Sequence, residues 1–152
     1  MYPSQHFILG SIFSFILYLL FPDFIGVAGF FVIVLSGVLI DVDHYLLYSY
    51  RKKDSSLKNA YSWFIKKSKF IMSLPKSQRK NFYFGIIILH GIEILALLLF
   101  LSLFSQIFFF IFLGFSFHLF LDLISFMNHG GRMDRFSLIY DLTHTKKLRK
   151  ID

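Results

Sequence analysis

The side chains of this chain that could do chemistry are histidines and carboxylates set inside or beside strongly apolar segments. An ionisable group at the centre of a membrane helix costs about 2.5–3.5 kcal/mol, so several together need water, a cation or each other as partners. Imidazole and carboxylate without thiolate favour Zn²⁺, Mn²⁺ or Fe²⁺ over Ca²⁺ or Mg²⁺, and the chain has no cysteine. The candidate metal ligands are His6, Asp41, Asp43, His44, His90, Glu93, His118 and Asp122.

The spacing of these residues suits a shared site. His90 and Glu93 are three residues apart and His118 and Asp122 four, so on helices each pair would share one face. Segment 41–44, Asp-Val-Asp-His, places three ligands where a helix meets a loop. Four histidines and four carboxylates exceed one tetrahedral site, so one or two ions are expected. A two-metal centre can activate water and stabilise the leaving oxygen in phosphoester cleavage.

Each candidate also has a structural explanation. His6 could lie in the membrane interface, segment 41–44 could be a solvated helix end, and His118 with Asp122 could be a polar pair that joins helices. Glu93 is the hardest to explain structurally. Asp23 is expected to be a turn or capping residue. Solvated loop chemistry is expected for the polar tail residues His129, Asp134, Asp141 and His144.

The elements that must position these residues are four apolar segments. The chain is 56% hydrophobic with 22 Phe among 152 residues, more than a soluble domain of this size can bury. Because lipid cannot satisfy backbone polar groups, such segments must be helices. The sequence predicts an all-α integral membrane protein, a single membrane domain over 1–152 with about four transmembrane helices in two hairpins. The expected helices are 7–21, 24–44, 82–104 and 107–127, with turns at Pro22-Asp23 and Ser105-Gln106.

The basic residues predict the orientation. Ten of the 16 Lys and Arg lie within 51–80 and six within 132–150. This is the pattern of cytoplasmic loops beside membrane helices, so a nucleic-acid partner is not expected. With the basic loop 49–80 and basic tail 128–152 inside, both termini are cytoplasmic in the plasma or inner membrane. All the candidate ligands then fall in the cytoplasmic half, which predicts an active site at that face.

The basic loop contains a segment, 57–74, in which aromatic and aliphatic residues alternate with lysines. The pattern is typical of a basic amphipathic helix on an anionic lipid surface, with Trp63 at the headgroup level. The alternative is a solvated linker whose apolar residues pack on the bundle.

The order of these motifs resembles the YdjM-like family of membrane-bound, metal-dependent hydrolases. The likeness rests on segments 5–10 (QHFILG), 39–44 (LIDVDH), 90–93 (HGIE) and 114–122 (GFSFHLFLD), and on the apolar strip 135–140. Two departures stand out: Ile40 replaces a usual Pro, and Glu93 stands near the position of a family His. The motif order is also, more distantly, similar to that of zinc-dependent phospholipases C, which favours a phosphoester substrate.

The leading hypothesis is therefore a membrane-embedded metal-dependent hydrolase of a phosphoester or lipid-linked substrate. Zn is the most favoured metal, with Mn or Fe as alternatives. Glu93 or Asp41 would be the general base that takes a proton from the attacking water. Membrane lipids are the expected partners, and the basic loop would attract an anionic lipid headgroup. The competing hypotheses are a small proton or divalent-cation carrier and a non-enzymatic membrane adaptor.

Overall fold

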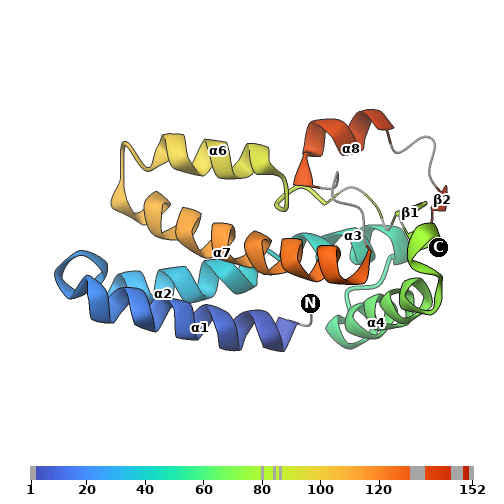
Figure 1. Ribbon diagram of the computed structural model, residues 1–152, viewed down its shortest axis with the longest axis horizontal. Helices are drawn as coiled ribbons and strands as arrows, with labels where there is room; N and C mark the ends of the chain where they lie inside the picture. The colour runs from blue at the N-terminus through green and yellow to red at the C-terminus, as the bar shows by residue number, and fades with distance from the viewer. Residues whose placement is uncertain are drawn as a thin grey trace. The chain divides into compact units, whose positions relative to one another are not determined.

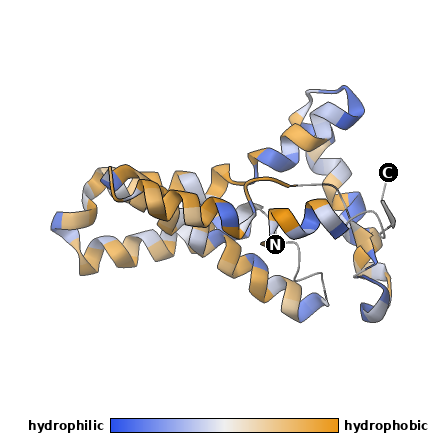
Figure 2. Ribbon diagram, turned by 90° about the horizontal axis from the view of Figure 1, so that it is seen from above, coloured by the Kyte–Doolittle hydropathy of each residue, from blue (hydrophilic) through white to orange (hydrophobic). Residues whose placement is uncertain are grey.

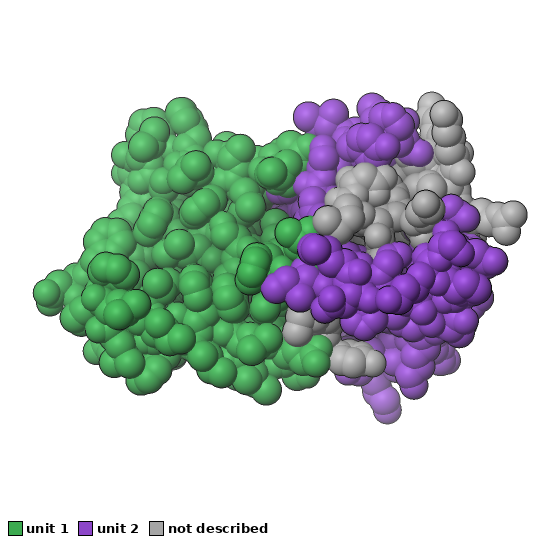
Figure 3. All heavy atoms as spheres, in the orientation of Figure 1, with its two compact units in different colours: residues 1–41, 92–123 green, residues 42–91, 124–152 purple. Residues whose placement is uncertain are grey.

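The chain folds into helices that group into two compact units (Figures 1 and 3). The computed structural model describes residues 3–79, 81–83, 85, 87–130, 136–144 and 149–150. Unit 1 comprises residues 1–41 and 92–123, and unit 2 comprises residues 42–91 and 124–152. Apart from one pair of two-residue strands, the regular structure of the described residues is helical, which confirms the all-α prediction.

Unit 1 begins with a helical hairpin, α1 (Pro3–Leu20) and α2 (Pro22–Leu39), whose helices pack against each other. Phe21 separates the two helices, and Pro22 occupies the first turn of α2, where its fixed φ suits a helix start and its missing N–H costs nothing. Gly26 adopts φ +58°, which interrupts α2 just after its start. The chain therefore reverses over residues 21–26, at the turn that the sequence predicts.

The second hairpin of unit 1 is formed by α6 (Ile92–Leu101) and α7 (Gln106–His129), whose last residues belong to unit 2. Its turn lies at the predicted Ser105-Gln106 break. The side chain of Gln106 donates a hydrogen bond to the Phe24 carbonyl, 2.8 Å away, and so ties the start of α7 to α2. The core of unit 1 consists of Ile25, Ile33 and Phe110, with Phe13, Leu17, Tyr18, Val32, Phe109 and Leu113 packed around them.

Glycines allow α2 and α7 to approach closely. A Cβ at Gly114 would lie 2.5 Å from the carbonyl oxygen of Ile33 and would also clash with Ser36 Oγ. A Cβ at Gly37 would lie 3.3 Å from the carbonyl oxygen of Gly114. Such small-residue contacts bring helix backbones together in membrane proteins. They also bring the backbone of α2 within hydrogen-bonding reach of the side chains of α7.

Unit 2 is built on the helices α3 (Val42–Lys52) and α4 (Leu57–Ser73). In the short connection between them, Asp54 accepts several hydrogen bonds. Asp54 accepts hydrogen bonds from the Tyr48 hydroxyl, the Ser56 N–H and the Asn59 amide. These bonds, that of Tyr48 first, hold the pKa of Asp54 below its usual value. Ser56 caps α4 by accepting from the Asn59 N–H. The elements of unit 2 are α3 (Val42–Lys52), α4 (Leu57–Ser73), α5 (Lys76–Arg79), β1 (Phe82–Tyr83), α8 (Leu138–His144) and β2 (Arg149–Lys150), with β1 and β2 parallel.

The helix predicted over 24–44 is wrong at its end, because a turn at residues 40 and 41 separates α2 from the next helix, α3. The Asp41 N–H bonds to the Val38 carbonyl three residues back, at 3.2 Å, which tightens and ends α2. A new helix, α3, then runs from Val42 to Lys52. Asp43 and His44 therefore open α3 instead of closing α2, and the loop predicted from residue 49 begins later.

The helix predicted over 82–104 is wrong for its first ten residues. The described residues of 82–91 form strand β1 and turns, and the helix α6 starts at Ile92. The Leu89 N–H, which a helix would use internally, instead donates to the Asp43 carboxylate at 2.9 Å. Gly85 has φ +152°, outside the helical region. His90 consequently precedes α6, and His90 and Glu93 do not share a helix face.

Two helices of the described chain are long and apolar enough to cross a membrane. They are the continuous stretch Pro22–Lys52 and α7, and α1 and α6 are shorter apolar helices. Length and composition identify them, and the core helix of a soluble protein would pass the same test. Coloured by hydropathy, the helices of unit 1 carry long hydrophobic runs (Figure 2).

Candidate metal centre

Unit 1 brings together four of the predicted metal ligands. His6 comes from α1, His118 and Asp122 come from α7, and Asp41 follows the end of α2. His6 Nε2 lies 3.2 Å from Asp122 Oδ1. His118 Nε2 lies 3.6 Å from Asp41 Oδ1 and 3.6 Å from Asp122 Oδ2. We refer to these four residues as the unit 1 cluster.

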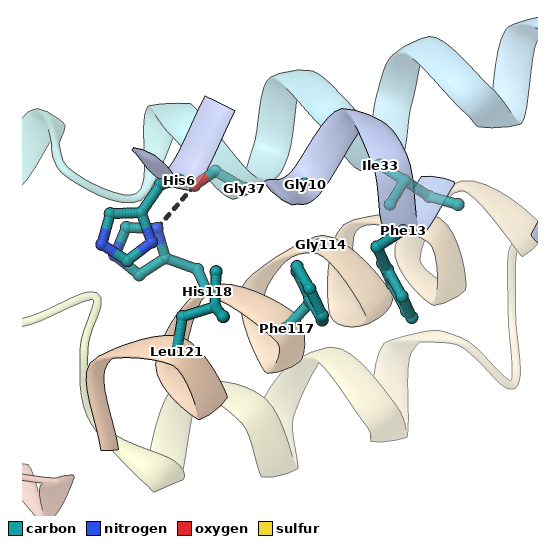
Figure 4. Close-up of a pocket in the computed structure, with 9 residues that line it drawn as sticks. All are labelled: His6, Gly10, Phe13, Ile33, Gly37, Gly114, Phe117, His118 and Leu121. Carbon is teal, nitrogen blue, oxygen red and sulfur yellow. Dashed lines mark hydrogen bonds between the residues drawn. The ribbon is translucent and has the colours of Figure 1, made fainter. Parts of the chain in front are cut away.

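The cluster is buried and its imidazoles are held in place. His6 is 4% exposed, His118 2% and Asp122 9%. The His6 and His118 rings stack with their centroids 3.8 Å apart. Figure 4 shows both rings at one end of a pocket whose lining also includes Gly37 and Gly114. The predicted pairing of His118 with Asp122 on one helix face is confirmed.

The tautomer of His118 follows from its backbone partner. Its Nδ1 lies 2.6 Å from the carbonyl oxygen of Gly37 (Figure 4). A carbonyl oxygen can only accept, so Nδ1 carries the proton when the ring is neutral, and Nε2 presents a lone pair. That lone pair points toward Asp41 and Asp122. A histidine that binds a metal through one nitrogen commonly donates from the other to a carbonyl or carboxylate.

The distances within the unit 1 cluster fit a bound ion. Zinc bonds to N and O of about 2.0–2.2 Å in a tetrahedron separate the ligand atoms by about 3.3 Å. The measured separations, 3.2, 3.6 and 3.6 Å, lie on either side of that value. The two longer ones exceed ordinary hydrogen bonds. One donor atom each from His6, His118 and Asp122 lies within 4.8 Å of the others, so the group could hold a metal ion.

Unit 2 contains a second cluster, in which Asp43 joins two histidines. His44 Nδ1 lies 2.9 Å from Asp43 Oδ1, and His90 Nδ1 lies 3.1 Å from Asp43 Oδ2. Asp43 Oδ2 also accepts the Leu89 N–H. An ionised carboxylate only accepts, so both imidazoles donate from Nδ1 and, when neutral, carry the lone pair on Nε2. Asp43 is 8% exposed and His90 is 8% exposed.

This geometry places Asp43 behind the imidazoles. The sequence predicts it as a metal ligand, but its two oxygens already accept three hydrogen bonds. Carboxylates that fix the tautomer and orientation of metal-binding histidines occupy the same position in known metal sites. Asp43 therefore fits the role of a positioning residue, with His44 and His90 as the donors that it orients.

Glu93 lies outside the unit 1 cluster. It is half-buried in the first turn of α6, where the helix dipole favours a carboxylate. Among the described residues, the groups that could hold a metal do not include it. Its predicted role as a ligand or general base stays a prediction.

The polar tail contains one residue that the sequence analysis misplaced. Asp141, expected in a solvated loop, is 4% exposed within α8. The apolar run 138–140, directly before Asp141, was the available signal of this short helix. His144 is exposed as expected, and His129 is exposed with its Nδ1 2.7 Å from the Ser125 carbonyl. Asp134 lies outside the described residues.

Sequence reasoning also missed the backbone part of the site. The Gly37 carbonyl orients His118, and Gly114 permits the close approach of α2 and α7. Glycines at 37 and 114 within apolar segments were the available signal.

No protein-family model, curated protein or solved structure that was compared with the chain matches it.

Proposed function

We propose that the protein is a membrane-embedded, metal-dependent hydrolase. The observation that carries the proposal is the unit 1 cluster. There, the Gly37 carbonyl fixes His118 so that Nε2 faces two carboxylates at 3.6 Å. Zinc is the most favoured ion for two imidazoles with carboxylates, and Mn²⁺ or Fe²⁺ would suit the same donors.

The membrane part of the proposal is supported by the exposure of apolar side chains. Only 33% of each window that could cross a membrane is buried inside the protein, whereas a soluble core helix would be mostly buried. Residues such as Phe7, Leu20, Val27 and Phe31 are more than half exposed. Such a surface requires lipid or another apolar partner.

We propose that both hairpins of unit 1 enter the bilayer from the cytoplasmic side. α1 has 18 residues, close to the roughly 20 needed to cross the hydrocarbon core. α6 has 10 residues and is therefore about 15 Å long, half of the roughly 30 Å thickness of the hydrocarbon core. Because each hairpin returns to its starting side, both termini and the basic segments lie in the cytoplasm, as the positive-inside rule favours.

A bound divalent ion would supply Lewis acidity toward water and toward an ester or phosphoryl oxygen. His6, His118 and Asp122 would hold it, with Asp41 as a fourth donor or as the base that takes a proton from water. Glu93 is the alternative base. We propose a phosphoester or lipid-linked substrate, because the resemblance to the YdjM-like family favours a hydrolase. The distant phospholipase C-like motif order favours phosphate.

Elemental analysis of detergent-purified protein tests the proposal. We expect one or more equivalents of Zn, Mn or Fe in the wild type and a loss of metal in His118→Ala, which removes a donor from the unit 1 cluster. His129→Ala is the matched control, since His129 lies on the same helix but is exposed at its end. It should retain the metal.

Helix content by circular dichroism and elution on size exclusion would show that each variant is folded. If the wild type contains no metal after reconstitution with Zn²⁺, Mn²⁺ and Fe²⁺, the hydrolase proposal is wrong. The cluster would then serve helix packing.

A further inference from the structure

One face of the helix α4 packs against the rest of unit 2. Ala60 and Lys67 are buried. Trp63 packs edge-on against Tyr48, with ring centroids 5.7 Å apart. The Lys67 ammonium lies over the Trp63 ring, 4.2 Å from its centroid. Phe64 packs in the same way against the ring of His44 at 5.1 Å.

A second face of α4, next to the packed one, is both apolar and basic. Leu57, Tyr61 and Met72 are 70%, 55% and 41% exposed. At about 100° per residue, these three side chains fall within a sector of about 60°. The exposed lysines Lys58, Lys66 and Lys69 follow directly around the helix. We call this set of six residues the outer face of α4.

We propose that the outer face of α4 docks on the surface of an anionic lipid bilayer. Its apolar sector would enter the headgroup boundary while its lysines contact lipid phosphates. Charge complementarity supports this partner, because segment 51–80 contains ten basic residues and one acidic residue. The inference rests on the membrane location in the proposed function and is independent of the metal site.

The position of α4 in the chain also supports lipid as the partner. In the proposed orientation α2 ends at the cytoplasmic face, and α3 and residues 53–56 separate its end from α4. A basic segment that follows a membrane helix so closely in the chain lies near the anionic lipid surface. Anionic lipids attract such segments strongly enough to change surface binding about fivefold per lysine.

Trp63 packs partly within unit 2. The sequence predicts it at the headgroup level; in the structure it is half-buried, with its ring against Tyr48 and Lys67, and its depth in a membrane stays a prediction. The segment forms a helix, as the sequence predicts, and its contact with lipid stays a prediction. One set of its apolar residues packs on α3, and another set, led by Tyr61, remains outside.

Single-cysteine fluorescence tests the inference, since the chain contains no native cysteine. The full chain would be labelled at Tyr61→Cys and, as a control, at Ser55→Cys in the exposed connection before α4. Both would be reconstituted into phosphatidylcholine vesicles with or without phosphatidylglycerol. We expect nitroxide-bearing lipids to quench the Tyr61 label in anionic vesicles, with added salt reducing the effect. The Ser55 label should remain accessible to iodide.

Removing lysine charges from α4 distinguishes docking on anionic lipid from burial of the Tyr61 label inside the protein. Lys58→Gln/Lys69→Gln should reduce the anionic-lipid dependence at Tyr61 by about 25-fold. Lys52→Gln/Lys76→Gln makes the same change of charge outside α4 and should have a smaller effect. Lipid quenching that is independent of phosphatidylglycerol would overturn the inference. A Tyr61 label open to iodide in both vesicle types would also do so, as would one shielded from both quenchers.

Discussion

At the residue scale, the protein fixes its histidines in two ways. His118 donates to a backbone carbonyl, whereas His44 and His90 both donate to the carboxylate of Asp43. In each case Nδ1 lies against a hydrogen-bond acceptor, and Nε2 carries the lone pair when the ring is neutral. The tautomer of three buried or half-buried imidazoles is thus determined by their hydrogen-bond acceptors.

Asp43→Asn tests the positioning role. An amide offers one acceptor oxygen, so it can serve one imidazole and must present N–H to the other. We expect one of the two rings to change its tautomer, detected by ¹⁵N chemical shifts of labelled histidine. Loss of a buried, charge-assisted acceptor should lower the free energy of unfolding by about 1–3 kcal/mol.

Asp23→Asn is the matched control, because Asp23 is exposed in the turn between α1 and α2. It should leave both measurements unchanged. If both rings in Asp43→Asn keep the proton on Nδ1, Asp43 does not set the tautomer.

At the element scale, the contact between α2 and α7 determines the site. The helices approach closely because residues 37 and 114 have no side chain, and this approach puts the Gly37 carbonyl 2.6 Å from His118 Nδ1. The stacked rings of Phe13 and Phe117, 4.1 Å apart, also join α1 to α7. Packing between helices therefore positions the donors.

Gly114→Ala should separate α2 from α7. The added Cβ would lie 2.5 Å from the Ile33 carbonyl oxygen, which is backbone and cannot rotate away. Overpacking of this kind costs about 1–3 kcal/mol. We expect a lower unfolding temperature in detergent and, because the Gly37 carbonyl moves from His118, weaker zinc binding by calorimetry.

Gly10→Ala provides the control for this substitution. Gly10 lines the same pocket, but a Cβ there would meet nothing within 4 Å. The higher helix propensity of Ala should make this variant as stable as the wild type, or more stable by up to about 1 kcal/mol. Equal effects of the two substitutions would show that the α2–α7 contact is not the cause.

At the scale of the whole molecule, the distribution of charge supports the proposed orientation. All 16 basic residues lie within 51–80 and 132–150, and the turns of the two hairpins have none. In the proposed orientation the turn between α1 and α2 faces the outside. The free energy that opposes translocation of Lys and Arg would hold the basic segments inside.

Labelling of intact cells tests this orientation. A membrane-impermeant thiol reagent should modify Asp23→Cys, exposed beside the turn between α1 and α2, without permeabilisation. Ser77→Cys, exposed on α5, should react only after the membrane is opened. Equal labelling of the two variants in intact cells would contradict the proposed orientation.

The sequence by itself determined the features that depend on local spacing. Helical class, the turns at Pro22-Asp23 and Ser105-Gln106, and the pairing of His118 with Asp122 follow from residues near one another in the chain. The convergence of His6 with that pair was also predictable, because two short hairpins place distant ionisable residues at one depth.

Only the tertiary structure decided the features that depend on distant hydrogen bonds. Asp43 accepts hydrogen bonds from the Leu89 N–H and the His90 ring, 46 and 47 residues away, and the helix predicted from residue 82 does not form there. The Gly37 carbonyl that orients His118 is 81 residues away. Hydropathy identifies the apolar segments, and local spacing identifies residues that share a helix face. Neither predicts which distant acceptor will bind a given backbone N–H or imidazole.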